Sequence, residues 1–244
     1  MLLTALIHYI HIVQANLVHH VGAFLPWHRL FVWAHEVLLQ RECGFTGAQP
    51  YWDELSENEQ ISNGTLTFDQ LAVFDHETGF GGKGLLQGNG CVTDGPFADL
   101  TLHLNSSGLP ADANGAGYCL SRNFNAANFQ KGKRSNIKTC FGYDARECYE
   151  TNPHSAGRSG VGAMWQQADL PSRQADMSGR NVPPAEILAR GNLSYSSAAE
   201  LDYDGDPGNV TTLNHTLWMG DLIAKATVGD VMDLGGQVSC AEYV

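Results

Sequence analysis

The stretch of sequence that decides the fold is residues 19–33, HHVGAFLPWHRLFVW. It combines a backbone break with the start of a helix. Gly22 loosens the chain, and Pro26 fits the first turn of a new helix, where its missing N–H costs nothing. The pattern predicts that one helix ends before His19 and that the next runs over residues 27–39.

Histidines are concentrated around this break, because six of the ten lie in the first 35 residues. On one continuous helix, His11 and His19 would be about 12 Å apart along the axis, at ~1.5 Å per residue, too far to share an ion. With a break between them, His11 projects from the first helix, His19 from the loop and His28 from the second helix. Three imidazoles without a nearby cysteine pattern fit copper or zinc.

The other histidines of this region receive different interpretations. His8 and His11 share a helix face and form a rival pair of ligands. His20 points away from His19 and is expected to support a ligand or to face solvent. His35 lies two turns beyond His28 and is expected to pack against its surroundings.

Composition limits the classes of protein that the chain can belong to. Its 244 residues are 43% hydrophobic and 16% charged, with a net charge of −12. An acidic surface repels phosphate, so neither nucleic acid nor an anionic membrane is expected as a partner. No apolar run reaches the roughly 18 residues that span a bilayer. We predict a single domain over residues 1–244 that is mainly α-helical and rich in loops.

The rest of the chain divides into segments that differ in composition and in hydrophobic periodicity. Residues 55–135 predict long loops with short helices or strands, held by disulfides, and within them residues 79–84, GFGGKG, predict a flexible loop. A helical segment is expected around residues 184–189, a polar turn region over 201–215, and one or two short helices over 216–235.

Cysteines and glycosylation sequons indicate the compartment. Six cysteines lack any C-x-x-C pair, which argues against a zinc ribbon or a redox motif. An even cysteine count together with several N-x-S/T sequons favours a secreted, disulfide-bonded glycoprotein. The N-terminus lacks a basic region and a cleavage site, so we expect the signal peptide to be absent from this chain. The sequons are at Asn63, Asn105, Asn192, Asn209 and Asn214.

The stretch at 19–33, with Glu36 and the segments 42–44 (ECG) and 50–53 (PYWD), resembles the first copper site of the tyrosinase/catechol oxidase family of type 3 copper proteins. The spacing of its histidines is similar to that of short, secreted fungal members. Many members carry a cysteine two residues before the second histidine, cross-linked to it, whereas this chain has Leu17 there. Further segments similar to the fungal group are 91–97, 119–122, 211–219 and 240–243.

The resemblance implies a four-helix-bundle-type copper domain with long loops. It implies that His11, His19 and His28 bind the first copper, with no catalytic residue beyond the metal ligands. The family uses two coppers and O2 to oxidise o-diphenols to o-quinones, and some members first hydroxylate monophenols. The implied partners are therefore a small phenolic substrate and O2; the resemblance gives no oligomeric state.

The second copper site is where the sequence departs from the family. The family builds it from a helical His-x3-His and a later histidine in an Asp-Pro-x-Phe-x-x-His-His segment. Here residues 136–170 hold only a remnant: His154 matches the first ligand, but Arg158 occupies the second position. A guanidinium has no lone pair to donate and repels a cation. The segment with the third ligand is absent after Met164, so most of the fourth helix is expected to be missing.

Three functions follow as alternatives. The chain is a copper phenol oxidase, as its family implies, or a catalytically defective member that holds at most one copper. The third alternative, an oxygen carrier like the related haemocyanins, also needs both sites and a much longer chain. A copper count and a catechol oxidation assay separate the first two.

Overall fold

The structure is a computed structural model, which describes residues 3–18, 23–85, 90–103, 116–140, 211–233 and 235–238. These residues group into two compact units. The N/C unit contains the described residues up to Pro50 together with 211–238, and the central unit contains those from Tyr51 to Cys140. The expected single domain stays a prediction, and each unit is described by itself.

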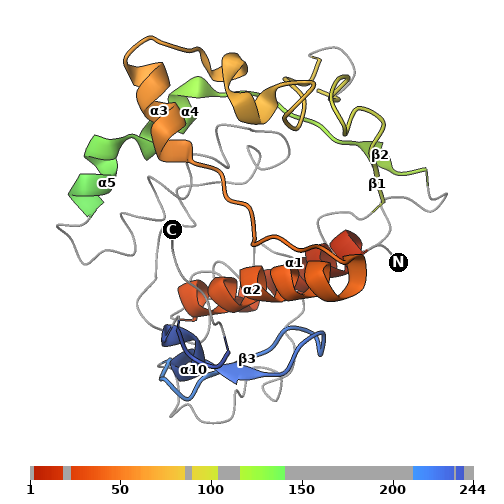
Figure 1. Ribbon diagram of the computed structural model, residues 1–244, viewed down its shortest axis with the longest axis vertical. Coiled ribbons are helices and arrows are strands. Elements are labelled where there is room, and N and C mark those ends of the chain that lie inside the picture. Colours follow the sequence, from red (N-terminus) through yellow and green to blue (C-terminus); the bar gives the residue numbers. More distant parts are fainter. Residues whose placement is uncertain are drawn as a thin grey trace. The chain divides into compact units, whose positions relative to one another are not determined.

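Two helices form the framework of the N/C unit. Helices α1 (Leu3–Val18) and α2 (Phe24–Cys43) pack along each other (Figure 1). In α1 the buried positions 7, 10, 14 and 18 follow helical spacing, and in α2 positions 27, 30, 34 and 38 do the same. Each helix therefore presents one stripe to a shared core, with Leu30 completely buried in it.

The predicted break between these helices is confirmed, because α1 ends at Val18 and α2 begins at Phe24. Pro26 lies in the first turn of α2, as expected. The helix is longer than the predicted 27–39 at both ends. At its start the helix includes the buried Phe24, and at its end it reaches Cys43. Gly44 follows with a left-handed φ of 67°, which turns the chain, and its N–H donates to the carbonyl of Leu39.

The C-terminal part of this unit was predicted only partly. Strands β3 (Thr216–Leu217) and β4 (Ala226–Thr227) pair antiparallel, and among the described residues of 211–238 only α10 (Val228–Met232) is helical. The prediction of one or two short helices over 216–235 is confirmed by α10, but the segment before it forms a strand pair, and the alternating burial around Leu217 fits that strand. Between the strands, Gly220 adopts a φ of 61°, where a Cβ would lie 2.0 Å from Cδ1 of Ile10.

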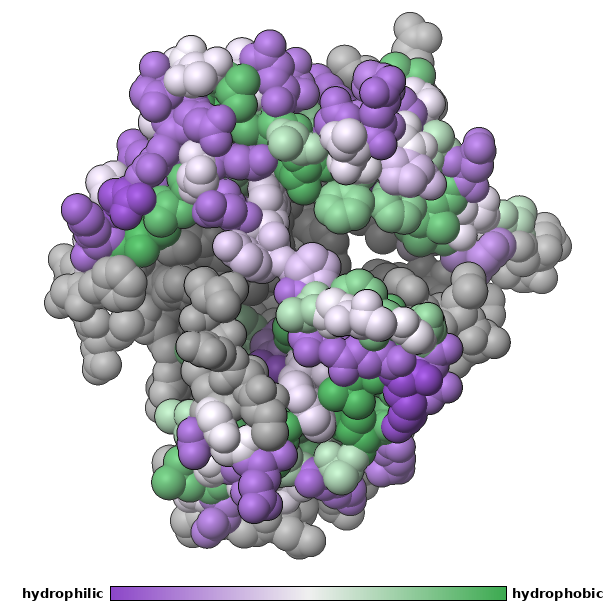
Figure 2. Space-filling model, viewed as in Figure 1, coloured by the Kyte–Doolittle hydropathy of each residue, from purple (hydrophilic) through white to green (hydrophobic). Residues whose placement is uncertain are grey.

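The central unit confirms the expectation of short elements in long loops. It contains α3 (Glu54–Ser62), η1 (Phe68–Gln70), η2 (Ala72–Phe74), α4 (Ala126–Phe129), η3 (Gln130–Gly132) and α5 (Arg134–Cys140). Strands β1 (Thr101–Leu102) and β2 (Tyr118–Cys119) form an antiparallel pair. Figure 2 shows hydrophilic residues gathered over α3 and α5. The core beneath is aromatic: Phe68, Phe74, Phe124, Phe129 and Trp52.

A disulfide joins Cys91 to Cys119 and confirms that the loops of this unit are cross-linked. Next to it, the glycine-rich segment 79–84 is packed, contrary to the predicted flexible loop. The guanidinium of Arg122 donates to the carbonyls of Gly81 and Gly82, and a Cβ at Gly84 would lie 1.6 Å from a backbone oxygen. Glycine is needed there for close backbone approach.

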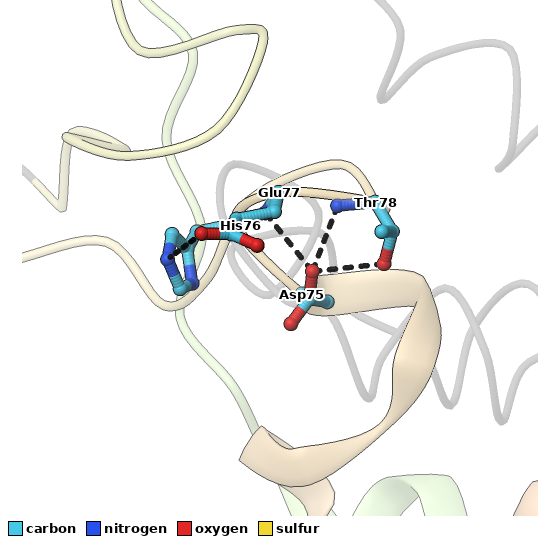
Figure 3. Close-up of polar contacts among 4 residues, drawn as sticks. All are labelled: Asp75, His76, Glu77 and Thr78. Atoms are coloured by element: carbon cyan, nitrogen blue, oxygen red, sulfur yellow. Dashed lines mark hydrogen bonds and ion pairs between the residues drawn. The ribbon is translucent and has the colours of Figure 1, made fainter.

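An exposed loop of the central unit is organised by Asp75 (Figure 3). Its Oδ1 accepts from the N–H of Thr78 at 2.7 Å, the hydroxyl of Thr78 at 2.8 Å and the N–H of Glu77 at 2.9 Å. These hydrogen bonds favour the ionised carboxylate, so the pKa of Asp75 lies below its usual value.

The described residues are mainly helical, and their strands are two-residue pairs, so the predicted fold class is confirmed. The helix expected around 184–189 and the expected loss of the fourth helix lie outside the described residues, and so do residues 141–170 of the predicted second-site remnant over 136–170.

Candidate metal centre

The core of the candidate site is a pair of histidines from the two framework helices. Nε2 of His11, on α1, lies 3.3 Å from Nε2 of His28, on α2. Histidine nitrogens bind zinc at about 2.0–2.1 Å. With bonds of that length, two nitrogens 3.3 Å apart subtend about 107° at a shared ion. That angle is close to tetrahedral, so the pair fits two ligands of one metal ion.

The backbone of α2 sets the tautomer of His28. Its Nδ1 lies 2.8 Å from the carbonyl oxygen of Phe24, one turn earlier. A carbonyl can only accept, so Nδ1 carries the hydrogen and Nε2 of the neutral ring keeps its lone pair. A partner on the second ring nitrogen is the usual way in which a protein orients a metal-binding imidazole. The lone pair of His28 is thereby directed to the side where His11 lies.

Aromatic rings surround the two imidazoles. The ring of His11 lies 5.5 Å from that of Phe31 and 6.0 Å from that of Trp27, measured between centroids. The ring of His28 lies 4.5 Å from that of Phe24 and 4.9 Å from that of Trp27. These apolar walls limit rotation of the imidazoles and lower the local dielectric constant, which strengthens metal–ligand attraction.

The other residues discussed for the two copper sites are not placed by the structure. His19, His20, His154 and Arg158 lie outside the described residues, and so does the side chain of His8. Within the described ranges, no three metal-binding side chains form a cluster. The assignment of His11, His19 and His28 as a set therefore stays a prediction, and so does that of His154.

Two further histidines have roles away from the pair. His35 lies on α2 with its Nδ1 3.0 Å from Oε1 of Gln49, whose N–H in turn donates to Glu36 at 2.7 Å. His215 is 3% exposed, and its carbonyl accepts the N–H of Val228 at 2.9 Å. His35 thus helps to hold the chain that follows α2.

Sequence reasoning missed two anchors on either side of His28. The indole of Trp27 donates to the carbonyl of Trp218 at 3.3 Å, and the guanidinium of Arg29 donates to the carbonyl of Val231 at 2.8 Å. Both bonds connect α2 with the C-terminal part of the N/C unit, where α10 and β3 lie against the helix (Figure 1). The Trp-His-Arg triplet was visible in the sequence, but it did not indicate which groups accept the hydrogen bonds of Trp27 and Arg29.

Comparisons with known proteins identify the family of this chain. Residues 3–183 match the family described as the common central domain of tyrosinase. A tyrosinase-like protein phomQ1' of Diaporthe leptostromiformis is 36% identical over 114 residues, covering 43% of this chain and 28% of that protein. The oxidase hkm6 of Aspergillus hancockii is 34% identical over 136 residues, covering 48% of each chain. The chain thus matches between about a quarter and a half of the length of these relatives.

Among solved structures, a polyphenol oxidase from Thermothelomyces thermophila resembles this fold with a TM-score of 0.63. The match covers 98% of this chain and 78% of that one at 21% sequence identity. The fold is helical and contains a histidine pair whose spacing fits two ligands of one metal ion. The family match over most of the chain is more specific: the chain belongs to the tyrosinase family, a family of type 3 copper oxidoreductases.

None of the helices in the described ranges is both long enough and apolar enough to cross a membrane.

Proposed function

We propose that this chain is a type 3 copper phenol oxidase by descent and that His11, His19 and His28 bind its first copper. The observation that carries the proposal is the 3.3 Å distance between the Nε2 atoms of His11 and His28. The proposed substrates are a small o-diphenol and O2, as in the family. Copper would supply one-electron steps to O2, and the family's reaction needs two copper ions.

The chain's own residues have defined tasks in this proposal. His11 and His28 bind the ion from two different helices, so its affinity depends on the packing of α1 against α2. The carbonyl of Phe24 holds the proton of His28 on Nδ1 and so keeps the other nitrogen available. Trp27 and Phe31 flank the ring of His11 and limit its rotation.

A second candidate function is a member of the family that binds one copper and does not turn over catechols. The presence of Arg158 in the position of a second-site ligand favours it, as does the absence of the segment with the third ligand. One imidazole, that of His154, cannot hold copper against water and free amino acids, and a guanidinium nearby increases the cost. This second function predicts close to one bound copper and no oxidation of catechols above background, whereas the first predicts turnover.

The test combines a copper count with an assay of catechol oxidation. His28→Ala and His11→Ala should each abolish stoichiometric copper binding, whereas His35→Ala, on the same helix, should leave it unchanged because His35 contacts Gln49 instead. Copper binding that survives His28→Ala would refute the first-site assignment. Two coppers with catechol turnover in the unmodified chain would refute the defective second site.

A pair of substitutions tests the second site further. Arg158→His alone should not restore oxidation, because the third ligand is still missing. Arg158→His together with insertion of the Asp-Pro-x-Phe-x-x-His-His segment after Met164 should raise the copper count toward two and restore oxidation. Restoration by Arg158→His alone would show that another residue completes the site.

We also propose that the protein is secreted and glycosylated. The Cys91–Cys119 disulfide supports an oxidising compartment. Two sequon asparagines of the described residues, Asn63 and Asn214, are exposed. Treatment of the protein from its native source with a peptide N-glycosidase should reduce its mass; an unchanged mass, equal to that of the bare chain, would refute the proposal.

A further inference from the structure

A buried amide lies on α1 close to the candidate copper ligand. Gln14 is 3% exposed, and its Nε2 is buried with no hydrogen-bond partner. It occupies the buried stripe of α1 between Ile10 and Val18, where the other positions are apolar. A buried amide donor without a partner lowers stability, and most such groups in proteins have one. Packing alone therefore gives no reason for glutamine at this position.

The helix places this amide next to His11. Residues three apart on a helix are neighbours on its surface, with Cβ atoms about 5–6 Å apart. Side chains on a helix also lean toward its N-terminus, so Gln14 covers the turn from which His11 projects. Helix geometry thus puts the buried amide of Gln14 on the face of α1 adjacent to His11.

We propose that Gln14 is a positioning residue of the copper centre, whose side-chain amide donates a hydrogen bond to a small anionic or oxygen ligand in the open coordination position of the copper bound by His11 and His28. Ligation by His11 and His28 leaves positions of a tetrahedral ion open for such a ligand. A donor in a site of low dielectric binds an anion more strongly than the same donor in water. This proposal rests on the proposed function, because it needs copper at the first site.

The two roles that the amide can have make opposite predictions for stability. If Gln14 has only a structural role, satisfied within the fold, removing its amide destabilises the protein. If the amide instead binds a ligand of the metal, it is an unpaired buried donor in the metal-free protein and lowers its stability. Removing the amide then stabilises the metal-free protein. The stability of the metal-free chain therefore reports on Gln14 independently of any activity.

The test compares Gln14→Met, which keeps the size of the side chain but has no donor, with Ile10→Val on the same stripe of α1. In the metal-free chain, Gln14→Met should raise the thermal midpoint by about 2–4 °C, whereas Ile10→Val should lower it. After loading with Cu(II), both variants should bind as much copper as the unmodified chain. Azide, titrated by its absorption with Cu(II), should bind about tenfold more weakly to Gln14→Met and unchanged to Ile10→Val.

Each possible result decides the matter. Unchanged azide affinity in Gln14→Met would overturn the proposal, and so would a lower thermal midpoint of its metal-free form. Failure of the unmodified chain to bind copper would overturn the proposed function and this inference together, and it is recognised before any variant is made. Loss of copper from Gln14→Met alone would also overturn it, because the residue would then support the ligands rather than the anion.

Discussion

Removal of the Cys91–Cys119 disulfide should destabilise the central unit substantially. The bridge closes a loop with a sequence separation of 28. For a loop of this length, chain entropy gives about 3.6 kcal/mol at 25 °C. For a chain of this size, 1 kcal/mol corresponds to roughly 2–4 °C, so the melting temperature should fall by about 7–14 °C.

The bridge also lies in a closely packed region, which adds to the expected effect. Cys91 pairs with Ser121 in a β-bridge, and Cys119 belongs to β2. Arg122, which follows Ser121, donates hydrogen bonds to the carbonyls of the glycine-rich segment 79–84. Loosening the bridge therefore allows Arg122 to leave a buried position in which burial lowers its pKa.

Calorimetry of the double variant Cys91→Ser/Cys119→Ser measures this effect without creating a new free thiol. Cys43→Ser is the matched control, since Cys43 is exposed and unpaired, and it should change stability by less than about 0.5 kcal/mol. The unmodified protein with a reductant should melt like the double variant. A double variant that melts within about 2 °C of the unmodified protein would refute the loop-closure reasoning.

Three further changes test the packing and the electrostatics. Leu30→Ala should cost about 2–5 kcal/mol because Leu30 is 0% exposed, and Val32→Ala, at a 48% exposed position of the same helix, should cost far less in denaturant unfolding. Gly220→Ala should destabilise the protein by about 1–3 kcal/mol, because its φ is positive and the new Cβ would contact Ile10. Ile10→Val removes Cδ1 and should recover part of that loss in a double-mutant cycle. Purely additive effects of the two substitutions would contradict the contact. Hydrogen bonds lower the pKa of Asp75 in the folded protein. The ionised carboxylate therefore stabilises the fold at a pH above its ordinary pKa of 3.8, and this contribution is lost as the pH falls through the lower pKa of the folded state. Asp75→Asn should therefore melt below the unmodified protein at about pH 7, with a difference that disappears in acid, and a difference independent of pH would count against the hydrogen-bonded carboxylate.

The part of the site near the helix break could be predicted from the sequence because it depends on local chemistry. Gly22 and Pro26 mark the break and the new helix, and the spacing of His11 and His28 follows from it. The tautomer of His28 could also have been inferred, since its partner is the carbonyl one turn earlier on the same helix. Local patterns carry information of this kind.

The remaining features depend on contacts between distant parts of the chain. The bonds of Trp27 and Arg29 join residues separated by 191 and 202 positions, and no periodicity encodes such partners. The glycines of segment 79–84 led to the prediction of a flexible loop. A glycine kept for conformational freedom and one kept for close backbone approach cannot be told apart in a sequence. Gln14, by contrast, is visible in the sequence as a polar residue in an apolar stripe. Its importance follows only from the structure, where its Nε2 is buried without a hydrogen-bond partner.

The anchors on either side of His28 have a consequence for biosynthesis. Translation proceeds at about 5–20 residues per second, so Val231 is made roughly 10–40 s after Arg29, given their separation of 202 residues. During that interval α2 has been synthesised, but Leu217, Met219 and Val231, which cover its apolar face, do not yet exist. The histidine-bearing helices therefore leave the ribosome with an uncovered hydrophobic stripe. The nascent chain is most open to chaperones, and to wrong associations, while the last quarter of the protein is still being made.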